Sequence, residues 1–551
     1  MPIIEINKKD LEKILKKKIT EKELEDLTSY TKTGIENIKG EIITLEIKDS
    51  NRPDMLSIEG IARELLGIIG REKGIPRYKL NKSDFEMIAE KKVSKIRPEI
   101  ACAVIKGIKL DDDAIKQLIQ LQEKLAEGFG RKRKEAAIGV YDFDKIRWPV
   151  RYTAFKSDEI KFVPLGMREA LTLRQILQIH DKGKEYAGLL AGDEYPIIMD
   201  ADKNVLSMPP IINSDYSGKV TEATRNLFIE VTGFNFERVS QTLNIIVSAL
   251  ADRGGKIFGV NLKNKKITTP EFKNKKKVLS TEEINKRLGI SIKPAEIIRL
   301  LEKARFSAKI KGNKIEVEIP FYRTDIIHPV DIIEDVAIMH GYQNIPAEEP
   351  EIAAIGSLLP ETIKAKKVSG LLTGLGFQET ASLNMTNKED LFKKMNLNNN
   401  GIIEIENPVS SSYSCLRNSI LPSLIGILSQ NTSSDYPQKI FEIGQTTRVN
   451  EKSENMAEEK AKLAIAVSHS TAGFTEIKQV IDYLLANLKV NHKISSIEHP
   501  SFIPGRAAEI MINNKPAGIF GEIHPKVLES WKLEMPVIAA EIDLTELMKY
   551  F

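Results

Sequence analysis

Hydrophobic positions in residues 1–85 follow two different spacings. Residues 10–15 place leucine and isoleucine on one face of an otherwise charged segment, which predicts an amphipathic helix with Asp10 as its N-cap. Residues 42–47 alternate between hydrophobic and polar side chains, as a strand with one buried face does. After a polar turn, residues 56–66 return to helical spacing. Together these elements predict a small α/β unit.

The next segment, residues 86–270, mixes strand-like runs with longer helical patterns. The strand-like runs are short stretches of alanine, valine and isoleucine, whereas the helical patterns repeat every three or four positions. We expect strands at 101–105 and 136–140, and helices at 113–129, from Thr221 onward and at 238–252. The mixture predicts an α+β domain.

Residues 271–346 open with a lysine-rich linker and continue with two short helical patterns, at 281–288 and 294–304. Gly289 ends the first helix, and a proline stands near the start of the second. A Lys-Gly-Asn-Lys turn at 311–314 then predicts a hairpin. We interpret this order of helix, turn, helix and hairpin as a winged-helix-like domain.

The remaining segment, residues 347–551, begins with a proline-rich connector and a predicted helix at 361–375. Strand patterns follow at 402–405, 439–443, 462–467, 508–512, 516–521 and 537–542. They predict a mostly antiparallel sheet flanked by helices. The fold class is therefore α+β and multidomain, with predicted domains at 1–85, 86–270, 271–346 and 347–551.

Composition narrows the class of protein. Hydrophobic residues make up 42% and charged residues 29% of the 551 residues, as in globular domains. The net charge is only +4, from 81 basic and 77 acidic residues, so composition alone does not indicate a nucleic-acid-binding protein. Cys102 and Cys415 are the only cysteines, which excludes a disulfide framework. With no signal peptide and no apolar run of about 18 residues, we expect a cytoplasmic protein without membrane contact.

The sequence lacks the common motifs of self-contained enzymes. It has no GxxxxGK[ST] phosphate loop, no GxGxxG fingerprint, no HExxH pair and no GxSxG elbow. Its seven histidines lie far apart, and none stands at metal-ligand spacing with another histidine or a cysteine. This pattern favours a scaffold or recognition protein over an independent catalyst.

Acidic residues gather at the start of one predicted helix. Asp331, Glu334 and Asp335 stand at i, i+3 and i+4 and share a helix face, and Asp325 can approach from the preceding strand end. Such carboxylates repel one another unless a cation or an arginine neutralises them. An all-oxygen cluster suits Mg²⁺. The alternative is an acidic first helical turn that faces water.

Four stretches, in order along nearly the whole chain, resemble the β chains of phenylalanyl-tRNA synthetases of the archaeal and eukaryotic type. The first is NRPDMLSIEGIAREL at 51–65, where Asp54 is expected to cap the following helix. The second runs over 206–233, and the third, which contains FYRTDIIHPVDIIEDVA, over 321–346. The fourth consists of C-terminal segments at 407–408, 416–424, 439–444, 499–508 and 518–525.

The resemblance implies a subunit of a heterotetrameric (α₂β₂) ligase. Its partners would be an α subunit, which attaches phenylalanine with ATP as the substrate of the complex, and the tRNA for phenylalanine. The resemblance also favours Mg²⁺ over the water-facing alternative, because four positions match the ligands assigned in the family: Asp325, Asp331, Glu334 and Asp335.

In this family, the second stretch lies in an editing domain that hydrolyses tyrosine wrongly attached to the phenylalanine tRNA. A mostly apolar pocket rejects an added hydroxyl by only about 100-fold, so a second, hydrolytic site is needed. Candidates to hold the tyrosine hydroxyl and a water are Asn213, Ser214, Thr221, Thr224, Arg225, Asn226 and Glu230. The alternative is that Asn213, Ser214 and Thr221 only cap turns and a helix. Many relatives have an acidic residue where this chain has Asn235, and this departure counts against full editing activity.

The fourth stretch resembles a class II synthetase catalytic fold that has lost its chemistry. An active class II site needs one arginine on ATP and another in a glycine-rich motif, and the chain has no GxGxxxR. Arg506 follows a single glycine, and we interpret it as structural or interfacial. Two alternatives to the editing subunit stay open, a noncatalytic scaffold that binds tRNA or protein and a freestanding aminoacyl-tRNA deacylase.

Overall fold

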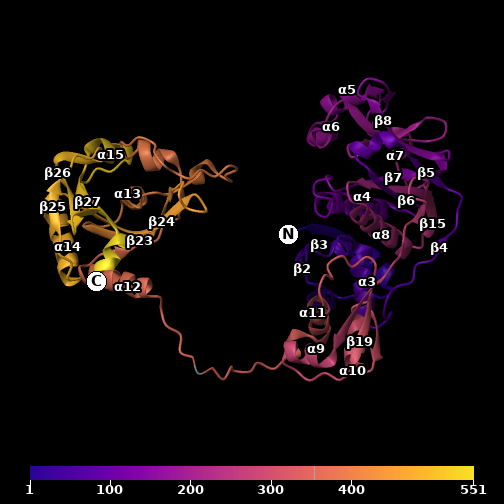
Figure 1. The fold of residues 1–551 in the computed structure, drawn as a ribbon, viewed down its shortest axis with the longest axis horizontal. Helices are drawn as coiled ribbons and strands as arrows, with labels where there is room; N and C mark the ends of the chain where they lie inside the picture. Colours follow the sequence, from indigo (N-terminus) through magenta and orange to yellow (C-terminus); the bar gives the residue numbers. More distant parts are fainter. Residues whose placement is uncertain (353) are drawn as a thin grey trace. The chain divides into compact units, whose positions relative to one another are not determined.

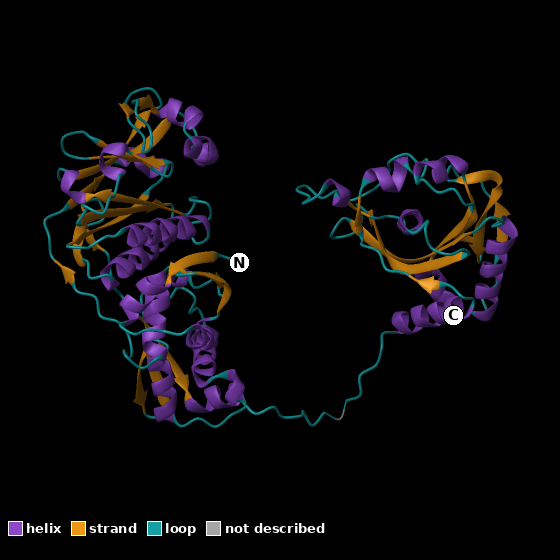
Figure 2. Ribbon diagram, turned by 180° about the vertical axis from the view of Figure 1, so that it is seen from behind, coloured by secondary structure: helices purple, strands orange, loops and turns teal. Residues whose placement is uncertain are grey.

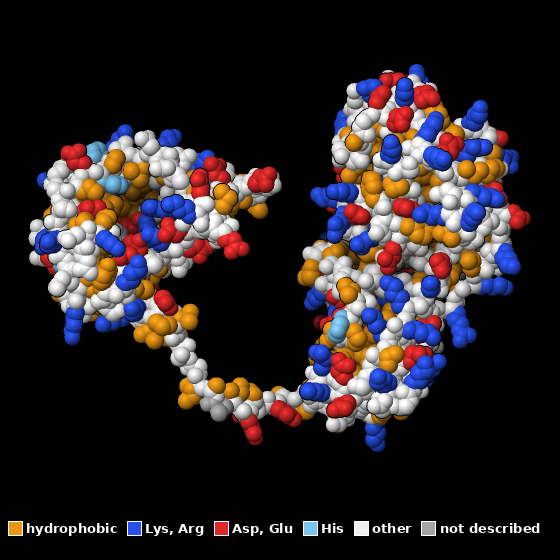
Figure 3. Space-filling model, viewed as in Figure 1, with side chains coloured by type: hydrophobic (Ala, Val, Ile, Leu, Met, Phe, Trp, Pro, Cys, Tyr) orange, Lys and Arg blue, Asp and Glu red, His pale blue; other side chains and the backbone are white. Residues whose placement is uncertain are grey.

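The computed structural model describes residues 1–352 and 354–551. The chain divides into two compact units, Met1–Glu349 and Pro350–Phe551 (Figure 1). Basic and acidic side chains are interspersed over the visible face of both units (Figure 3), in keeping with the small net charge. Within the described ranges, every helix is too short or too polar to cross a lipid bilayer.

The first unit opens with a three-stranded antiparallel sheet in the order β1-β3-β2, covered by helices (Figure 2). The elements are β1 (Ile3–Asn7), α1 (Lys8–Leu15), α2 (Glu21–Thr28), β2 (Thr33–Lys39), β3 (Ile42–Ile47) and α3 (Ile58–Ile68). The strand predicted at 42–47 is confirmed as β3, whose buried residues alternate with more exposed ones.

The two helix caps predicted in this region are wrong. Asn7 caps α1, and Asp10 lies inside the helix, where its carboxylate is buried in an ion pair. Ser57 caps α3 by accepting a hydrogen bond from a main-chain N–H. Asp54 instead binds the guanidinium of Arg52 at 2.7 Å. In both cases an arginine already occupies the carboxylate that was expected to cap the helix.

The middle of the first unit is an eleven-stranded sheet in the order β13-β12-β11-β8-β5-β15-β6-β14-β7, with β4 and β16 also paired to β15. Its strands are β4 (Leu80–Asn81), β5 (Glu86–Ala89), β6 (Glu99–Lys106), β7 (Ala136–Asp142), β8 (Val150–Lys156), β11 (Glu194–Met199), β12 (Val205–Met208), β13 (Ile212–Asn213), β14 (Asn226–Gly233), β15 (Lys256–Leu262) and β16 (Ile267–Thr269). Its helices are α4 (Asp112–Glu127), α5 (Leu173–Ile179), α6 (Asp181–Tyr186), α7 (Asp215–Gly218) and α8 (Phe236–Asp252), and β9 (Lys161–Phe162) pairs with β10 (Leu171–Thr172) outside the sheet.

The helix predicted from Thr221 onward is wrong, since the chain makes a turn there and then forms strand β14. Leu227, Ile229 and Val231 are buried in the core shared with α4 and α8, whereas Phe228 packs on the opposite face. Because both faces are covered, the strand has no clean hydrophobic alternation, and its sequence does not separate a buried strand from a buried helix. The other predicted elements of this segment are confirmed within a few residues.

The last part of the first unit holds a small sheet in the order β17-β19-β18, packed against three helices. The elements are β17 (Lys275–Ser280), α9 (Thr281–Leu288), α10 (Pro294–Lys303), β18 (Ser307–Lys311), β19 (Lys314–Ile319) and α11 (Pro329–His340). The predicted hairpin is confirmed: Lys311 pairs with Lys314 across the turn, and Gly312 there has a φ of 64°.

The second unit is built on a seven-stranded sheet in the order β20-β23-β24-β28-β27-β26-β25, antiparallel except for β20 and β23. Its elements are α12 (Pro360–Gly374), β20 (Gln378–Glu379), β21 (Met385–Thr386), β22 (Cys415–Leu416), α13 (Leu421–Gln430), β23 (Gln438–Val449), β24 (Ala457–Ser468), α14 (Phe474–Asn487), β25 (Lys493–Ser496), β26 (Phe502–Ile512), β27 (Lys515–Ile523), α15 (Pro525–Ser530), β28 (Val537–Asp543) and α16 (Leu544–Leu547). The strand predicted at 402–405 is wrong: the chain makes only an isolated bridge there, between Glu404 and Cys415.

Candidate functional site

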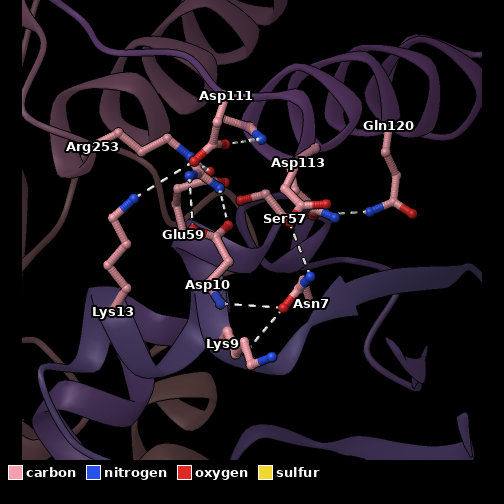
Figure 4. Close-up of polar contacts among 12 residues, drawn as sticks. Asn7, Lys9, Asp10, Lys13, Ser57, Glu59, Asp111, Asp113, Gln120 and Arg253 are labelled. Carbon is pink, nitrogen blue, oxygen red and sulfur yellow. Dashed lines mark hydrogen bonds and ion pairs between the residues drawn. The ribbon is translucent and has the colours of Figure 1, made fainter. Parts of the chain in front are cut away.

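Helix α4 is fixed between the N-terminal sheet and the central sheet by polar contacts (Figure 4). Asn7 donates a hydrogen bond to Asp113 of α4 at 3.0 Å, and the main-chain N–H of Glu5 donates to Gln120 at 2.8 Å. At the end of α8, Arg253 binds Asp10 at 2.7 Å and also binds Glu59 of α3. Asp113 and Gln120 lie on the side of α4 away from the residues that line the cavity described next, so these contacts hold the helix from its far side.

A cavity of about 330 Å³ lies at the β7 edge of the central sheet, between α4 and the turn from β12 to β13. Its apolar lining consists of Ile115, Leu118, Ile119, Ala126, Ala137, Ile138, Val140, Leu165, Pro209, Pro210, Ile211, Ile212 and Val220. Its polar lining consists of Gln122, Glu123, Arg133, Ser207, Asn213, Lys219 and Glu230, with Gly218 completing the wall. A mostly apolar cavity with a few converging polar groups is typical of a small-molecule site.

Glu230 reaches this cavity because a glycine stands beside it. In the sheet register, Glu230 of β14 lies opposite Gly139 of β7. A β-carbon added at Gly139 would collide with the Glu230 carboxylate and with the hydroxyl of Tyr141. The edge strand therefore leaves a gap at this one position, and the Glu230 side chain occupies it.

The Glu230 carboxylate is buried, and only one of its oxygens is used. Oε1 accepts a hydrogen bond from the Tyr141 hydroxyl at 2.9 Å, and that hydroxyl also lies 2.8 Å from Oγ of Ser207. Oε2 has no hydrogen-bond partner among the described residues. Burial raises the pKa of Glu230 to about 7, although the hydrogen bond from Tyr141 and the charge of Arg97 favour ionisation. An unpaired buried oxygen is available to a polar ligand group.

Three of the seven predicted editing residues lie at or beside the cavity. Asn213 and Glu230 line it, and Nδ2 of Asn213 donates to the carbonyl of Val140 at 3.2 Å. Ser214 is buried next to Asn213, with Oγ 3.4 Å from Oγ of Ser217. Ser214 does not line the cavity, so among the three only Asn213 and Glu230 can contact a ligand there.

The other four predicted editing residues organise the turn before β14. Thr224 donates to the carboxylate that ends β7 at 3.2 Å and accepts from the main-chain N–H of Thr221 at 3.2 Å. Arg225 donates to nearby main-chain carbonyls, and Asn226 donates to the carboxylate of Asp144 at 2.9 Å. None of the four lines the cavity. The turn-capping alternative named only Thr221 among these four, and Thr221 takes part in the turn through its main-chain N–H.

Asn235 also lies outside the cavity lining. Its side-chain oxygen caps α8 by accepting from the main-chain N–H of Arg238 at 3.1 Å. Aspartate caps helices about as well as asparagine, so an exchange between the two preserves this role. The departure at Asn235 therefore keeps the helix cap, and it changes no group that lines the cavity.

Sequence reasoning missed Tyr141, Ser207, Arg133 and Lys219. Tyr141 and Gly139 stand two residues apart on β7, so both belong to one face of a strand that the sequence did predict. That spacing was a usable signal for Tyr141. The positions of Ser207 and Lys219 depend on how β12 and the turn after α7 fold back onto β7, which no local pattern encodes.

A basic loop at residues 131–134, with the sequence Arg-Lys-Arg-Lys, connects α4 to β7 beside the cavity. Arg131, Lys132 and Arg133 have φ values of 48°, 52° and 64°. Left-handed backbone at a residue other than glycine costs roughly 1–3 kcal/mol. Arg133 donates to the carbonyls of Pro210 and Ile211 at 3.1 and 2.7 Å, and so ties the loop to the opposite cavity wall.

The four carboxylates predicted to bind Mg²⁺ do not form one ligand set. Asp325 and Asp335 both bind Arg323 at 2.7 Å. Asp331 accepts from the main-chain N–H groups of residues 327 and 328 at 2.8 and 2.7 Å, at the start of its own helix. Glu334 binds a lysine of the N-terminal sheet region at 2.8 Å.

Charge compensation by an arginine explains this arrangement. Arg323 lowers the pKa of Asp325 despite burial, whereas burial raises the pKa of the more deeply enclosed Asp335 to about 6. Among the described residues, no group of three or more His, Cys, Asp or Glu side chains is placed to hold a metal ion. The four residues do not fit Mg²⁺ in this arrangement, and magnesium at these positions stays a prediction.

Three family models together match most of the chain. The B3/4 domain matches residues 98–249, the tRNA synthetase B5 domain 278–342, and the phenylalanyl tRNA synthetase beta chain CLM domain 345–544. The phenylalanine–tRNA ligase beta subunit of Pyrococcus horikoshii is 43% identical over 557 residues, with 100% of both chains covered. Those of Thermococcus onnurineus and Methanococcus maripaludis are 42% and 40% identical, with at least 99% of each chain covered. The chain belongs to the phenylalanine–tRNA ligase beta-subunit family.

A solved structure agrees with this family assignment. An N-terminal fragment of the phenylalanyl-tRNA synthetase beta subunit from Pyrococcus horikoshii superposes with a TM-score of 0.60 at 42% identity, covering 62% of this chain and 100% of the fragment. The multidomain α+β fold of the chain is thus that of the family. Within it, the cavity residues at 115–138 and 207–230 fall inside the span matched by the B3/4 domain.

In the second unit of this family member, the arginines of the C-terminal stretch have partners within the chain. Arg417 is buried and binds Glu442 at 2.7 Å, the hydroxyl of Ser382 at 2.7 Å and a main-chain carbonyl. Arg506 is exposed and binds Glu522 of the neighbouring strand at 2.6 Å. The guanidinium of Arg417 is therefore enclosed by its partners, whereas that of Arg506 is 60% exposed and uses one nitrogen in its ion pair.

Proposed function

We propose that this chain is the editing subunit of a phenylalanine–tRNA ligase. It assembles with a separate α subunit as an α₂β₂ heterotetramer, binds the tRNA for phenylalanine and hydrolyses tyrosine from mischarged tRNA. The family assignment and the full-length match to ligase beta subunits support the ligase, and the cavity at the β7 edge supports the editing activity.

The observation that carries the editing proposal is the unpartnered oxygen of Glu230 inside a mostly apolar cavity. A tyrosine side chain packs its ring against the apolar wall, and its hydroxyl pairs with Oε2. Phenylalanine fits the same wall but leaves Oε2 unpaired, which costs about 1–3 kcal/mol. The site therefore prefers the amino acid that the ligase must remove.

Hydrolysis in this cavity needs no covalent nucleophile. The ester between amino acid and ribose is already activated, so a positioned water is sufficient. Asn213 and Ser207 are neutral polar side chains of the cavity wall that can hold the ester or the water, and Ser207 shares the Tyr141 hydroxyl with Glu230. Glu230 itself serves recognition, with Tyr141 holding its carboxylate in place.

The second unit has the role of a class II synthetase-like domain without its own chemistry. The partners of Arg417 support this, because its buried guanidinium is already bound to the carboxylate of Glu442. Aminoacylation, with ATP as substrate, then belongs to the α subunit. The helices and hairpin over 275–340 form a winged-helix-like domain, which in the sequence follows the editing segment and precedes the class II synthetase-like unit.

Release of labelled tyrosine from mischarged phenylalanine tRNA tests the proposal. The chain co-expressed with its α subunit should charge phenylalanine and release tyrosine faster than the spontaneous rate. The same assay on the chain alone separates the alternatives: full release without the α subunit indicates a freestanding deacylase, and release by neither preparation indicates a noncatalytic scaffold. Size exclusion of the co-expressed chains measures the stoichiometry.

A further inference from the structure

The basic loop at 131–134 has one side chain that bonds within the protein and three that are exposed to solvent. Arg133 is used inside the molecule: it donates to two carbonyls of the opposite cavity wall, and its guanidinium lies 4.2 Å from the ring centre of Tyr186. Arg131, Lys132 and Lys134 are exposed, and they form no ion pair or side-chain hydrogen bond with any described residue. The loop therefore presents three unpaired cations beside the cavity.

The backbone of this loop is built to hold one conformation. The three left-handed residues are fixed by main-chain hydrogen bonds, from Lys132 to the carbonyl of Glu127 at 2.9 Å and from Arg133 to that of Ala126 at 2.9 Å. Gly130 allows the close approach, since a β-carbon there would lie 2.7 Å from the Ala126 carbonyl oxygen. Strained residues that their surroundings hold in place concentrate at ligand-binding sites. Because the N–H groups are used, a ligand would meet the side chains.

The charge of the loop fits an anionic polymer. Residues 127–135 contain four basic side chains and two acidic ones, Glu127 and Glu135, which gives this segment a net charge of +2. Lys219, which lines the same cavity, adds a further cation. Lysine and arginine on a fixed loop bind phosphodiester groups without reading base sequence.

We propose that Arg131, Lys132 and Lys134 bind the phosphates of the single-stranded 3′ end of the tRNA whose aminoacyl group enters the cavity. This inference rests on the proposed editing function. An aminoacyl ester is carried by the terminal ribose, so when the amino acid fills the cavity, the phosphates of the preceding nucleotides emerge beside it. Arg133 acts as the tie that fixes the loop, and the three exposed cations hold the RNA chain.

The test compares two substrates in the assembled heterotetramer. Tyrosyl-tRNA carries the phosphates, and 2′(3′)-O-tyrosyl-adenosine carries the same ester without them. The variant is Arg131→Asn, Lys132→Asn and Lys134→Gln, since asparagine tolerates left-handed backbone. The charge-matched control is Lys73→Gln, Lys79→Gln and Lys82→Gln, three lysines that line no part of the cavity. Lys132→Arg tests whether a different cation suffices.

We expect the variant to lose about tenfold or more in kcat/KM on tyrosyl-tRNA and nothing on tyrosyl-adenosine. The slope of log kcat/KM against log salt should become shallower by about 2, from three contacts at roughly 0.7 each. The control triple variant and Lys132→Arg should keep the wild-type slope. An equal loss on both substrates would overturn the proposal, because the loop would then only shape the cavity. No loss on either substrate would overturn it too, and would leave the editing function standing.

If the wild-type heterotetramer hydrolyses neither substrate, the editing function fails. RNA binding then tests the proposed role of the loop. The probe is a fluorescent RNA hairpin with a single-stranded 3′ tail, measured by anisotropy against the same hairpin without the tail. A tail-dependent gain in affinity that the triple variant loses supports the contact. Equal affinity of wild type and variant for the tailed hairpin overturns it.

Discussion

Tyr141 and Glu230 form a hydrogen-bonded pair, with the phenol oxygen 2.9 Å from Oε1 of the carboxylate, and Glu230 lines a mostly apolar cavity. The two residues come from neighbouring strands, and Gly139 provides the space in which they meet. The pair orients the carboxylate so that one oxygen is satisfied within the protein and the other remains for a ligand. This division of roles leads to the first three predictions.

Removing the carboxylate should remove the preference for tyrosine. A hydrogen bond to a charged group contributes about 1.5–3 kcal/mol, so Glu230→Ala should slow deacylation of tyrosyl-tRNA by roughly 10- to 100-fold. Deacylation of phenylalanyl-tRNA should change little, because phenylalanine has no hydroxyl to lose. The measurement is the ratio of the two rates in the assembled heterotetramer. Glu123→Gln, a carboxylate on the exposed side of the same cavity, is the control; an unchanged ratio in Glu230→Ala would assign recognition elsewhere.

The raised pKa of Glu230 should appear in the pH dependence of stability. Burial raises it from 4.5 to about 7, so between these values the folded state holds a proton that the unfolded state has lost. This contribution to stability is complete below pH 4.5 and is lost as the pH rises through 7, a change of roughly 3 kcal/mol. Urea unfolding between pH 5 and 8 should show a smaller decline in Glu230→Gln than in wild type. Parallel curves would mean that Glu230 titrates normally.

Filling the gap at Gly139 should disable the cavity and leave charging intact. The added methyl of Gly139→Ala collides with both Tyr141 and Glu230, and overpacking of this kind costs typically about 1–3 kcal/mol. Release of tyrosine should fall strongly, whereas phenylalanine charging should persist. Gly188→Ala is the matched control, because its β-carbon would meet no atom within 4 Å. If both alanine variants edit like wild type, Glu230 does not act through this gap.

Much of the fold follows from local patterns, and the failures have identifiable causes. The helix at Thr281–Leu288 and the hairpin after it were predictable because strong stop signals bound an amphipathic pattern. Strand β14 was not predictable, because it is buried on both faces and its hydrophobic residues therefore show no clean alternation. The caps Asn7 and Ser57 were missed because arginines bind the carboxylates of Asp10 and Asp54. Arg253, which binds Asp10, is distant in the sequence, whereas Arg52 is two residues from Asp54.

The candidate site shows the same limit. Asn213 and Glu230 were identified through the family resemblance, and both line the cavity. Their physical roles needed the register of β14 with β7, which places Glu230 beside Gly139 and near Tyr141. No spacing rule connects residues about 90 positions apart in the chain, so the pair could only be found in three dimensions.

Magnesium binding to the chain alone should be absent at the acidic helix start. Arg323 supplies the positive charge for Asp325 and Asp335, and Asp331 is used by its own helix. We expect calorimetric titration of the isolated chain to give no saturable Mg²⁺ site there, and EDTA to leave its Tm unchanged. A saturable site that disappears in Asp331→Asn with Glu334→Gln would contradict this geometry and establish the magnesium prediction. Glu361→Gln, an exposed acid on another helix, controls for surface binding.

The isolated chain should not activate phenylalanine. Class II activation requires arginines that bind ATP, and the sequence has no glycine-rich GxGxxxR motif to supply one. Arg417, in the C-terminal stretch, gives its guanidinium to Glu442, and releasing it would leave a buried carboxylate unpaired, a cost of about 3–5 kcal/mol. The chain alone should therefore show no phenylalanine-dependent exchange of labelled pyrophosphate into ATP, and co-expression with the α subunit should restore it. Exchange by the chain alone that survives repeated purification and falls in Arg417→Met would place a synthetic site in this unit and reverse the assignment of roles.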